Sequence, residues 1–126
     1  MANSEAKAAR WVSHLASHPA VPFGPLLRSH FEAGRISALC QCGCNSFDLE
    51  IPAEASLEPI ARPGGGGMFF EIQFASTGAA ELACLCFVDT RGYLAGIDVT
   101  CGGANHAPVP DDIQVGEVVY RSRDAV

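Results

Sequence analysis

The stretch LCQCGCNSF, residues 39–47, carries three cysteines at alternate positions, Cys40, Cys42 and Cys44. Thiolates bind soft metal ions and act as nucleophiles, so this stretch is a candidate for a metal site or a reactive thiol. A structural zinc site needs four soft ligands in tetrahedral reach, usually supplied as two pairs that are each close in sequence. The candidate ligands are Cys40, Cys42, Cys44, Cys84, Cys86, Cys101 and His106.

The spacing of these cysteines leaves two interpretations open. The CxxC pattern of zinc knuckles is absent, and side chains two residues apart on one strand lie about 6.5–7 Å apart by strand rise. A turn at Gly43 would bring two of the first three cysteines together, and the later cysteines would then supply the second pair. Alternatively, Cys84 and Cys86 pack as small hydrophobic side chains, because Leu82 and Val88 continue their face of a predicted strand. We predict no cofactor, with zinc as the alternative.

A catalytic thiol is the other chemistry that the cysteines raise. Cys101 stands at a predicted strand end before two glycines, and His106 follows five residues later. A nucleophilic cysteine needs a base held by a third group, and no sequence feature ties an Asp or Asn to His106. His14 and His18 are four residues apart on a predicted helix, without the glutamate pattern of HExxH. The sequence predicts no catalytic residue and favours a binding protein over an enzyme.

Charge is distributed unevenly along the chain, whose net charge is −6. Residues 1–40 hold four basic and two acidic side chains, whereas residues 41–126 hold four arginines and twelve acids. Nucleic-acid surfaces need clustered Lys and Arg, and the chain has one lysine, so we expect no nucleic-acid partner. The acidic part suits a basic protein partner, although acidity also keeps small proteins in solution.

Size and hydropathy indicate one domain spanning residues 1–126. The chain has 126 residues, of which 48% are hydrophobic, enough for one compact core. No window approaches the roughly 18 apolar residues of a membrane span, and the N-terminal residues lack the apolar stretch of a secretory signal. We therefore expect a cytoplasmic protein with reduced cysteines and no membrane partner. Homo-oligomerisation is compatible with the sequence.

The elements that must position these residues follow from periodicity. Apolar residues recur at three- and four-residue spacing over residues 4–17 and again over residues 23–33, which predicts two helices in a helical part spanning 1–34. Period-two alternation then predicts a sheet part over 35–126. The expected strands lie near 36–42, 47–51, 70–74, 81–89, 93–101 and 115–121. The fold class is α+β, with two N-terminal helices packed on a mostly antiparallel sheet of about five or six strands.

Two details of the predicted sheet bear on function. The strand near 81–89 is apolar on both faces, so we expect a central strand buried on both sides. On other strands, acids alternate with apolar residues and should face solvent. Thr90-Arg91-Gly92 reads as a hairpin turn. The predicted partner-binding residues are Asp48, Glu50 and Glu71 on the sheet, with Arg91 and Tyr93 at the hairpin tip.

Four short segments together resemble small uncharacterised bacterial domains, some of which are similar to immunity proteins of polymorphic toxin systems. The segments are LLRSHFEAG (26–34), CQCGCNSF (40–47), FVDTRGYLAGIDV (87–99) and PVPDD (108–112), and the resemblance covers about residues 22–112. It implies a non-enzymatic α+β protein that binds and blocks a partner. The acidic sheet would then suit a basic toxin such as a nuclease. No functional residue is carried over from the resemblance.

Overall fold

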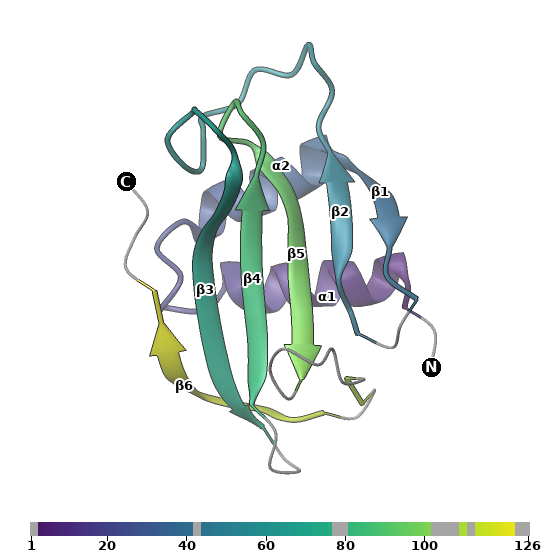
Figure 1. The fold of residues 1–126 in the computed structure, drawn as a ribbon, viewed down its shortest axis with the longest axis vertical. Coiled ribbons are helices and arrows are strands. Elements are labelled where there is room, and N and C mark those ends of the chain that lie inside the picture. The colour runs from purple at the N-terminus through teal and green to yellow at the C-terminus, as the bar shows by residue number, and fades with distance from the viewer. Residues whose placement is uncertain (1–2, 42–43, 77–80, 102–108, 111–112, 123–126) are drawn as a thin grey trace.

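The protein has two layers, a pair of helices and one sheet (Figure 1). The computed structural model describes residues 3–41, 44–76, 81–101, 109–110 and 113–122. The helices are α1 (Glu5–Ala16) and α2 (Gly24–Ala33). The strands are β1 (Arg35–Leu39), β2 (Phe47–Glu50), β3 (Gly67–Ser76), β4 (Leu82–Val88), β5 (Leu94–Cys101) and β6 (Val115–Arg121). The predicted α+β class is confirmed.

Local chemistry accounts for the two helices. The Ser4 side chain caps α1 by accepting a hydrogen bond from the Lys7 amide at 3.2 Å. The apolar residues of α1 are buried against the sheet. Helix α2 has Pro25 in its first turn, where a proline is tolerated. The helices approach closely at Gly24, where a Cβ atom would overlap the Ala16 carbonyl oxygen. Neither helix is long and apolar enough to cross a membrane.

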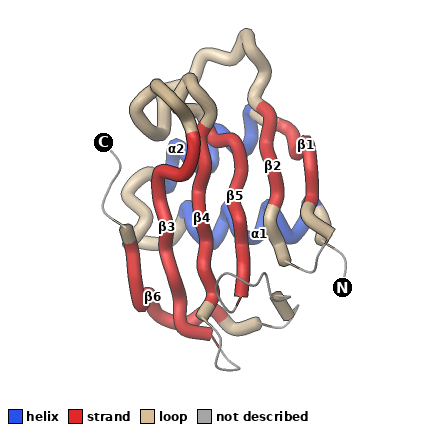
Figure 2. The backbone as a smooth tube through the Cα atoms, viewed as in Figure 1, coloured by secondary structure: helices blue, strands red, loops and turns tan. Residues whose placement is uncertain are grey.

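The sheet has the strand order β1-β2-β5-β4-β3-β6, and every neighbouring pair is antiparallel (Figure 2). The pairing of Leu39 with Phe47 closes the β1–β2 hairpin, and the Cys40 amide continues it by donating to Ser46 O at 3.0 Å. β1 and β2 therefore form an antiparallel hairpin. Cys42 and Gly43 lie outside the described residues.

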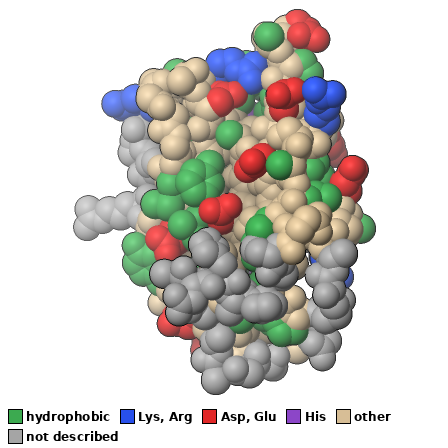
Figure 3. Space-filling view, turned by 45° about the vertical axis from the view of Figure 1, so that its right-hand side comes forward, with side chains coloured by type: hydrophobic (Ala, Val, Ile, Leu, Met, Phe, Trp, Pro, Cys, Tyr) green, Lys and Arg blue, Asp and Glu red, His purple; other side chains and the backbone are tan. Residues whose placement is uncertain are grey.

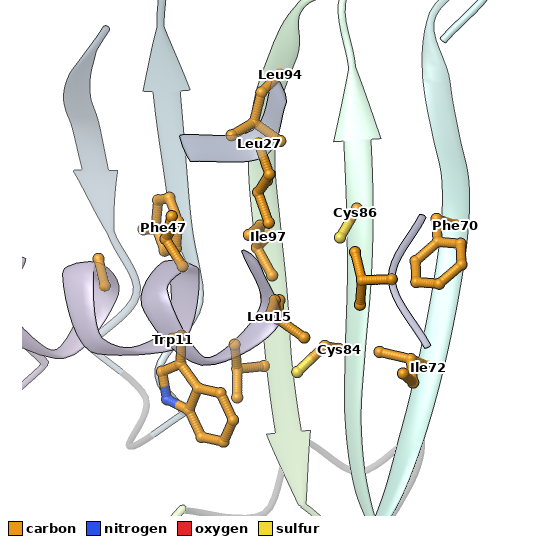
Figure 4. Close-up of a cluster of buried hydrophobic side chains, with 14 of the residues drawn as sticks. Trp11, Leu15, Leu27, Phe47, Phe70, Ile72, Cys84, Cys86, Leu94 and Ile97 are labelled. Carbon is orange, nitrogen blue, oxygen red and sulfur yellow. The ribbon is translucent and has the colours of Figure 1, made fainter. Parts of the chain in front are cut away.

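The hydrophobic core lies between the helices and one face of the sheet (Figure 4). Every second residue of β4, from Leu82 to Val88, points into it. The expectation that β4 is buried on both faces is wrong in part. Both helices lie on one side of the sheet, so Leu85 and Phe87 on the other side are only half-buried, although Ala83 is buried.

Candidate functional site

The face of the sheet turned away from the helices carries two rows of residues that cross the strands. In the first row, Glu71 on β3 pairs with Leu85 on β4, which pairs with Asp98 on β5. In the second row, Met68 is opposite Phe87, and Gly96 lies between Phe87 and Asp48. Each row thus has an apolar centre on β4; the first row has a carboxylate on each neighbouring strand, and the second has one on β2, beyond Gly96 of β5. We call Asp48, Met68, Glu71, Leu85, Phe87 and Asp98 the open face.

The apolar part of the open face is accessible to a partner. The side chain of Met68 is 52% exposed, and Leu85 and Phe87 are half-buried. The same side of the sheet is closed further along the strands, where Ala83 and Thr100 are buried. Figure 3 shows acidic and hydrophobic side chains side by side on this side of the molecule.

Two of the acids on this side of the sheet have neighbours that hold their side chains. Glu71 accepts a hydrogen bond from the Gln73 amide at 2.7 Å. Glu50, further along β2, pairs with Arg35 at 2.9 Å, and the two side chains are 61% and 80% exposed. An exposed ion pair of this kind contributes little to stability, so Glu50 remains accessible to a competing cation.

Arg91 occupies a different environment from the one that its place in a hairpin turn predicts. Its guanidinium donates to Asp89 Oδ2 from Nε at 3.1 Å and from Nη2 at 2.7 Å. It also donates to the carbonyl oxygens of Ile51 at 2.9 Å and Pro52 at 3.0 Å. Arg91 therefore ties the β4–β5 turn to the chain that leaves β2, and the four bonds together use most of its five donors.

Asp89 completes this turn. Its Oδ1 accepts from the amides of Arg91 at 2.8 Å and Tyr93 at 3.2 Å. Burial by itself would raise the pKa of Asp89, but these hydrogen bonds and the Arg91 charge outweigh it, so the pKa lies below its usual value. Gly92, in the predicted hairpin turn, adopts φ 80°, and its carbonyl accepts from the Ile60 amide at 2.8 Å.

Tyr93 is buried, with 8% of its surface exposed. Its hydroxyl accepts from the Leu57 amide at 2.9 Å and donates to Ala55 O at 3.4 Å, and the Arg91 guanidinium lies 4.5 Å from its ring centroid. The edge of its ring meets His30, whose centroid is 5.3 Å away. Arg91 and Tyr93 therefore hold the residues between β2 and β3 in place, and we do not include them in a binding surface.

His30 is the fully buried polar residue beneath this loop. Its Nδ1 accepts from the Leu94 amide at 3.1 Å, which leaves Nε2 to carry the proton and donate to Glu58 O at 2.7 Å. A single neutral imidazole thus joins α2 to β5 and to the β2–β3 connection. These hydrogen bonds account for the burial of His30 as a structural residue, without a catalytic role.

The sulfurs of Cys84 and Cys86 lie inside the hydrophobic core (Figure 4). Burial raises the pKa of Cys86 to about 12. Burial, and then the nearby Cys86, raises the pKa of Cys84 well above its usual value. Both stay protonated at neutral pH, which disfavours metal binding and nucleophilic attack. Cys101 points into the same core and is also buried.

Cys40 and Cys44 lie elsewhere, on the wall of a shallow cavity of about 270 Å³ that Asp48 and Asp98 also line. Within residues 3–41, 44–76, 81–101, 109–110 and 113–122, no three His, Cys, Asp or Glu side chains are placed to hold a metal ion. Cys42 and His106 lie outside these ranges. The described part of the chain therefore separates the predicted zinc ligands into two groups, and we do not propose zinc.

Sequence reasoning had placed the residues of the open face only in part. Alternation predicts that Asp48 and Glu71 of this face, and Glu50 further along β2, point toward solvent, whereas Leu85 and Phe87 are expected to be buried. No sequence pattern could have predicted that these two side chains are partly exposed, because their neighbours on β4 are equally apolar.

Comparison with known proteins identified no relationship. No family model, no curated protein and no solved structure matches the chain. The resemblance to immunity proteins therefore stays a prediction.

Proposed function

We propose that the protein binds a basic protein through the open face of its sheet and acts by blocking that partner, as an immunity-type protein does. The observation that carries the proposal is the arrangement of the two rows, in which carboxylates lie in the same rows as a half-buried apolar centre on β4. Interfaces commonly combine an apolar centre with a polar rim, and this face has that plan.

The two kinds of side chain would make different contributions. Leu85, Phe87 and Met68 would lose water on contact, at about 25 cal/mol for each Å² of apolar area buried. The carboxylates would attract Lys and Arg side chains and speed encounter with a basic partner. Because the carboxylates are near the surface, this attraction should weaken as salt shortens the Debye length from about 10 Å at 0.1 M.

A charge-reversal pair tests the proposal. The face variant is Asp48→Lys with Glu71→Lys, which reverses one acid in each row. The control is Glu54→Lys with Glu58→Lys, which makes the same change in net charge on exposed residues of the β2–β3 connection. Immobilised protein would be used to isolate basic proteins from lysate of the source cells, and binding of each purified protein would then be measured at low and high salt.

We expect a specific partner to bind the face variant at least about tenfold more weakly than the control, with circular dichroism of both variants unchanged. The proposal is wrong if both variants lose binding equally, because bulk charge would then be responsible. It is also wrong if the face variant binds as well as the wild type, or if no basic protein binds.

A further inference from the structure

A second cavity, which shares no lining residue with the open face, lies where three parts of the chain meet. Its volume is about 200 Å³. Helix α1 contributes one wall, a residue just before β2 the second, and the segment leading into β6 the third. The lining residues are Arg10, Trp11, His14, Asn45, Pro110, Ile113 and Val115. The volume exceeds that of a single water molecule several-fold, so the cavity has room for a small organic molecule.

Two buried polar atoms on α1 have no hydrogen-bond partner within the described structure. They are Nε1 of Trp11 and Nε2 of His14, and both residues line this cavity. Trp11 is 4% exposed, so its indole N–H has lost water without gaining an acceptor. A buried polar atom left unpaired costs about 1–3 kcal/mol, so two such atoms in one cavity are unusual for a purely structural site.

The positions of these residues on α1 are those of one helix face. Arg10 and His14 are four residues apart, and Trp11 and His14 are three apart, which brings their side chains together. The rings of Trp11 and His14 meet edge to face with centroids 6.0 Å apart. His14 also packs against Phe74 at 5.4 Å, so the core holds its ring in place.

The chemistry of the lining selects one class of ligand. An indole N–H only donates, and the Arg10 guanidinium only donates and carries a positive charge. Burial, and then the neighbouring His18, lowers the pKa of His14, so its imidazole is neutral at neutral pH and can present Nε2–H. Among the lining residues that the structure describes, none is a carboxylate. These side chains favour a ligand that brings acceptor oxygens and negative charge.

The remaining walls limit the charge and shape of that ligand. Pro110, Ile113, Val115 and the indole ring are apolar, and Arg10 is the one cation among the lining residues within the described ranges. A phosphate dianion would keep one charge uncompensated beside apolar walls, at a cost in desolvation. A monocarboxylate with an apolar substituent satisfies both halves of the site.

We infer that this cavity is a binding site for a small monocarboxylate, with Arg10, Trp11 and His14 donating to the carboxylate and the apolar wall taking its substituent. This site is independent of the partner-binding proposal, because its residues lie on α1, just before β2 and around the start of β6, and none belongs to the open face.

The single tryptophan of the chain makes the site directly observable. In a ¹⁵N-labelled sample, one indole N–H resonance reports on Trp11. We would titrate sodium benzoate, benzamide and inorganic phosphate at constant ionic strength. We expect benzoate to shift this resonance saturably, with Kd of about millimolar or tighter. Benzamide has the same ring without the charge and should bind at least about tenfold more weakly, as should phosphate.

Three variants assign the contacts. Arg10→Gln should weaken benzoate about threefold to tenfold, because Arg10 is exposed and its charge is screened. Trp11→Phe keeps an aromatic ring and removes the donor, and calorimetry should show about two- to tenfold weaker binding. Arg62→Gln removes an arginine that lines a different cavity and should leave the affinity unchanged.

Several outcomes would overturn the inference. They are an indole resonance that does not move up to the solubility limit of benzoate, equal binding of benzamide or phosphate, and equal effects of Arg10→Gln and Arg62→Gln. Arg10→Gln changes an exposed side chain and should fold, so the test stands even if Trp11→Phe is unstable.

Discussion

Replacing Arg91 by alanine should destabilise the protein, because Arg91 joins the β4–β5 turn to the connection that follows β2. The substitution removes two hydrogen bonds to Asp89 and two to the carbonyl oxygens of Ile51 and Pro52. It also removes the cation from the Tyr93 ring, 4.5 Å away. The carboxylate of Asp89 would lose its countercharge but keep its two bonds from backbone amides.

The magnitude follows from the number of bonds and their exposure. A hydrogen bond to a charged group contributes about 1.5–3 kcal/mol when buried. The side chains of Arg91 and Asp89 are 36% and 31% exposed, so water replaces part of what is lost. We expect the free energy of unfolding to fall by about 2–3 kcal/mol, out of about 5–15 for a domain of this size. Arg91→Lys keeps the positive charge, so it should lose less stability, about 1–2 kcal/mol. It still loses some because one ammonium cannot span both sides of the contact.

Urea unfolding followed by circular dichroism measures this loss, with Arg35→Ala as the matched control. Arg35 is 80% exposed and makes an ion pair with Glu50, so its replacement should cost no more than about 1 kcal/mol. The reasoning is refuted if Arg91→Ala costs no more than Arg35→Ala. A variant that keeps full stability but loses a protein partner would instead support the predicted role of Arg91 in partner binding.

Two further predictions follow from the turn and the core. Gly92→Ala should lower the free energy of unfolding by about 2–4 kcal/mol, because alanine is strained at φ 80° and its Cβ would overlap the Ala61 carbonyl oxygen. A smaller loss in urea unfolding would show that the turn rearranges. Cys84 and Cys86 should resist alkylation in the native state, whereas the half-buried Cys40 should react before them. Peptide mass spectrometry of samples taken over time measures this order. Rapid labelling of Cys86 in the native protein would contradict its raised pKa.

Local patterns predicted the elements well because each element depends on few residues. The four- and three-residue spacing of α1 and the cap at Ser4 act within one or two helical turns. The turn at Gly92 depends on one residue that tolerates positive φ. Alternation on β2 and β3 correctly placed Asp48 and Glu71 away from the core.

The faces of β4 show where local patterns stop. Both of its faces are apolar, so nothing in the strand itself says which one the helices cover. The two helices precede the sheet and lie together on one side of it, which leaves Leu85 on the other side between Glu71 of β3 and Asp98 of β5. Cys84 and Cys86 point into the core because they lie on the face of β4 that the helices cover.

The sequence by itself determined the fold class, the order of the elements and the acidic character of the sheet, since these depend on periodicity and composition. Tertiary structure alone decided which residues meet across long separations. It placed Arg91 against Ile51 and Pro52, forty and thirty-nine residues away. It also brought the indole of Trp11 to Asn45 and Val115 around one cavity. Such contacts form because the helices and strands pack to bury apolar surface, and no local pattern encodes the partner that packing supplies.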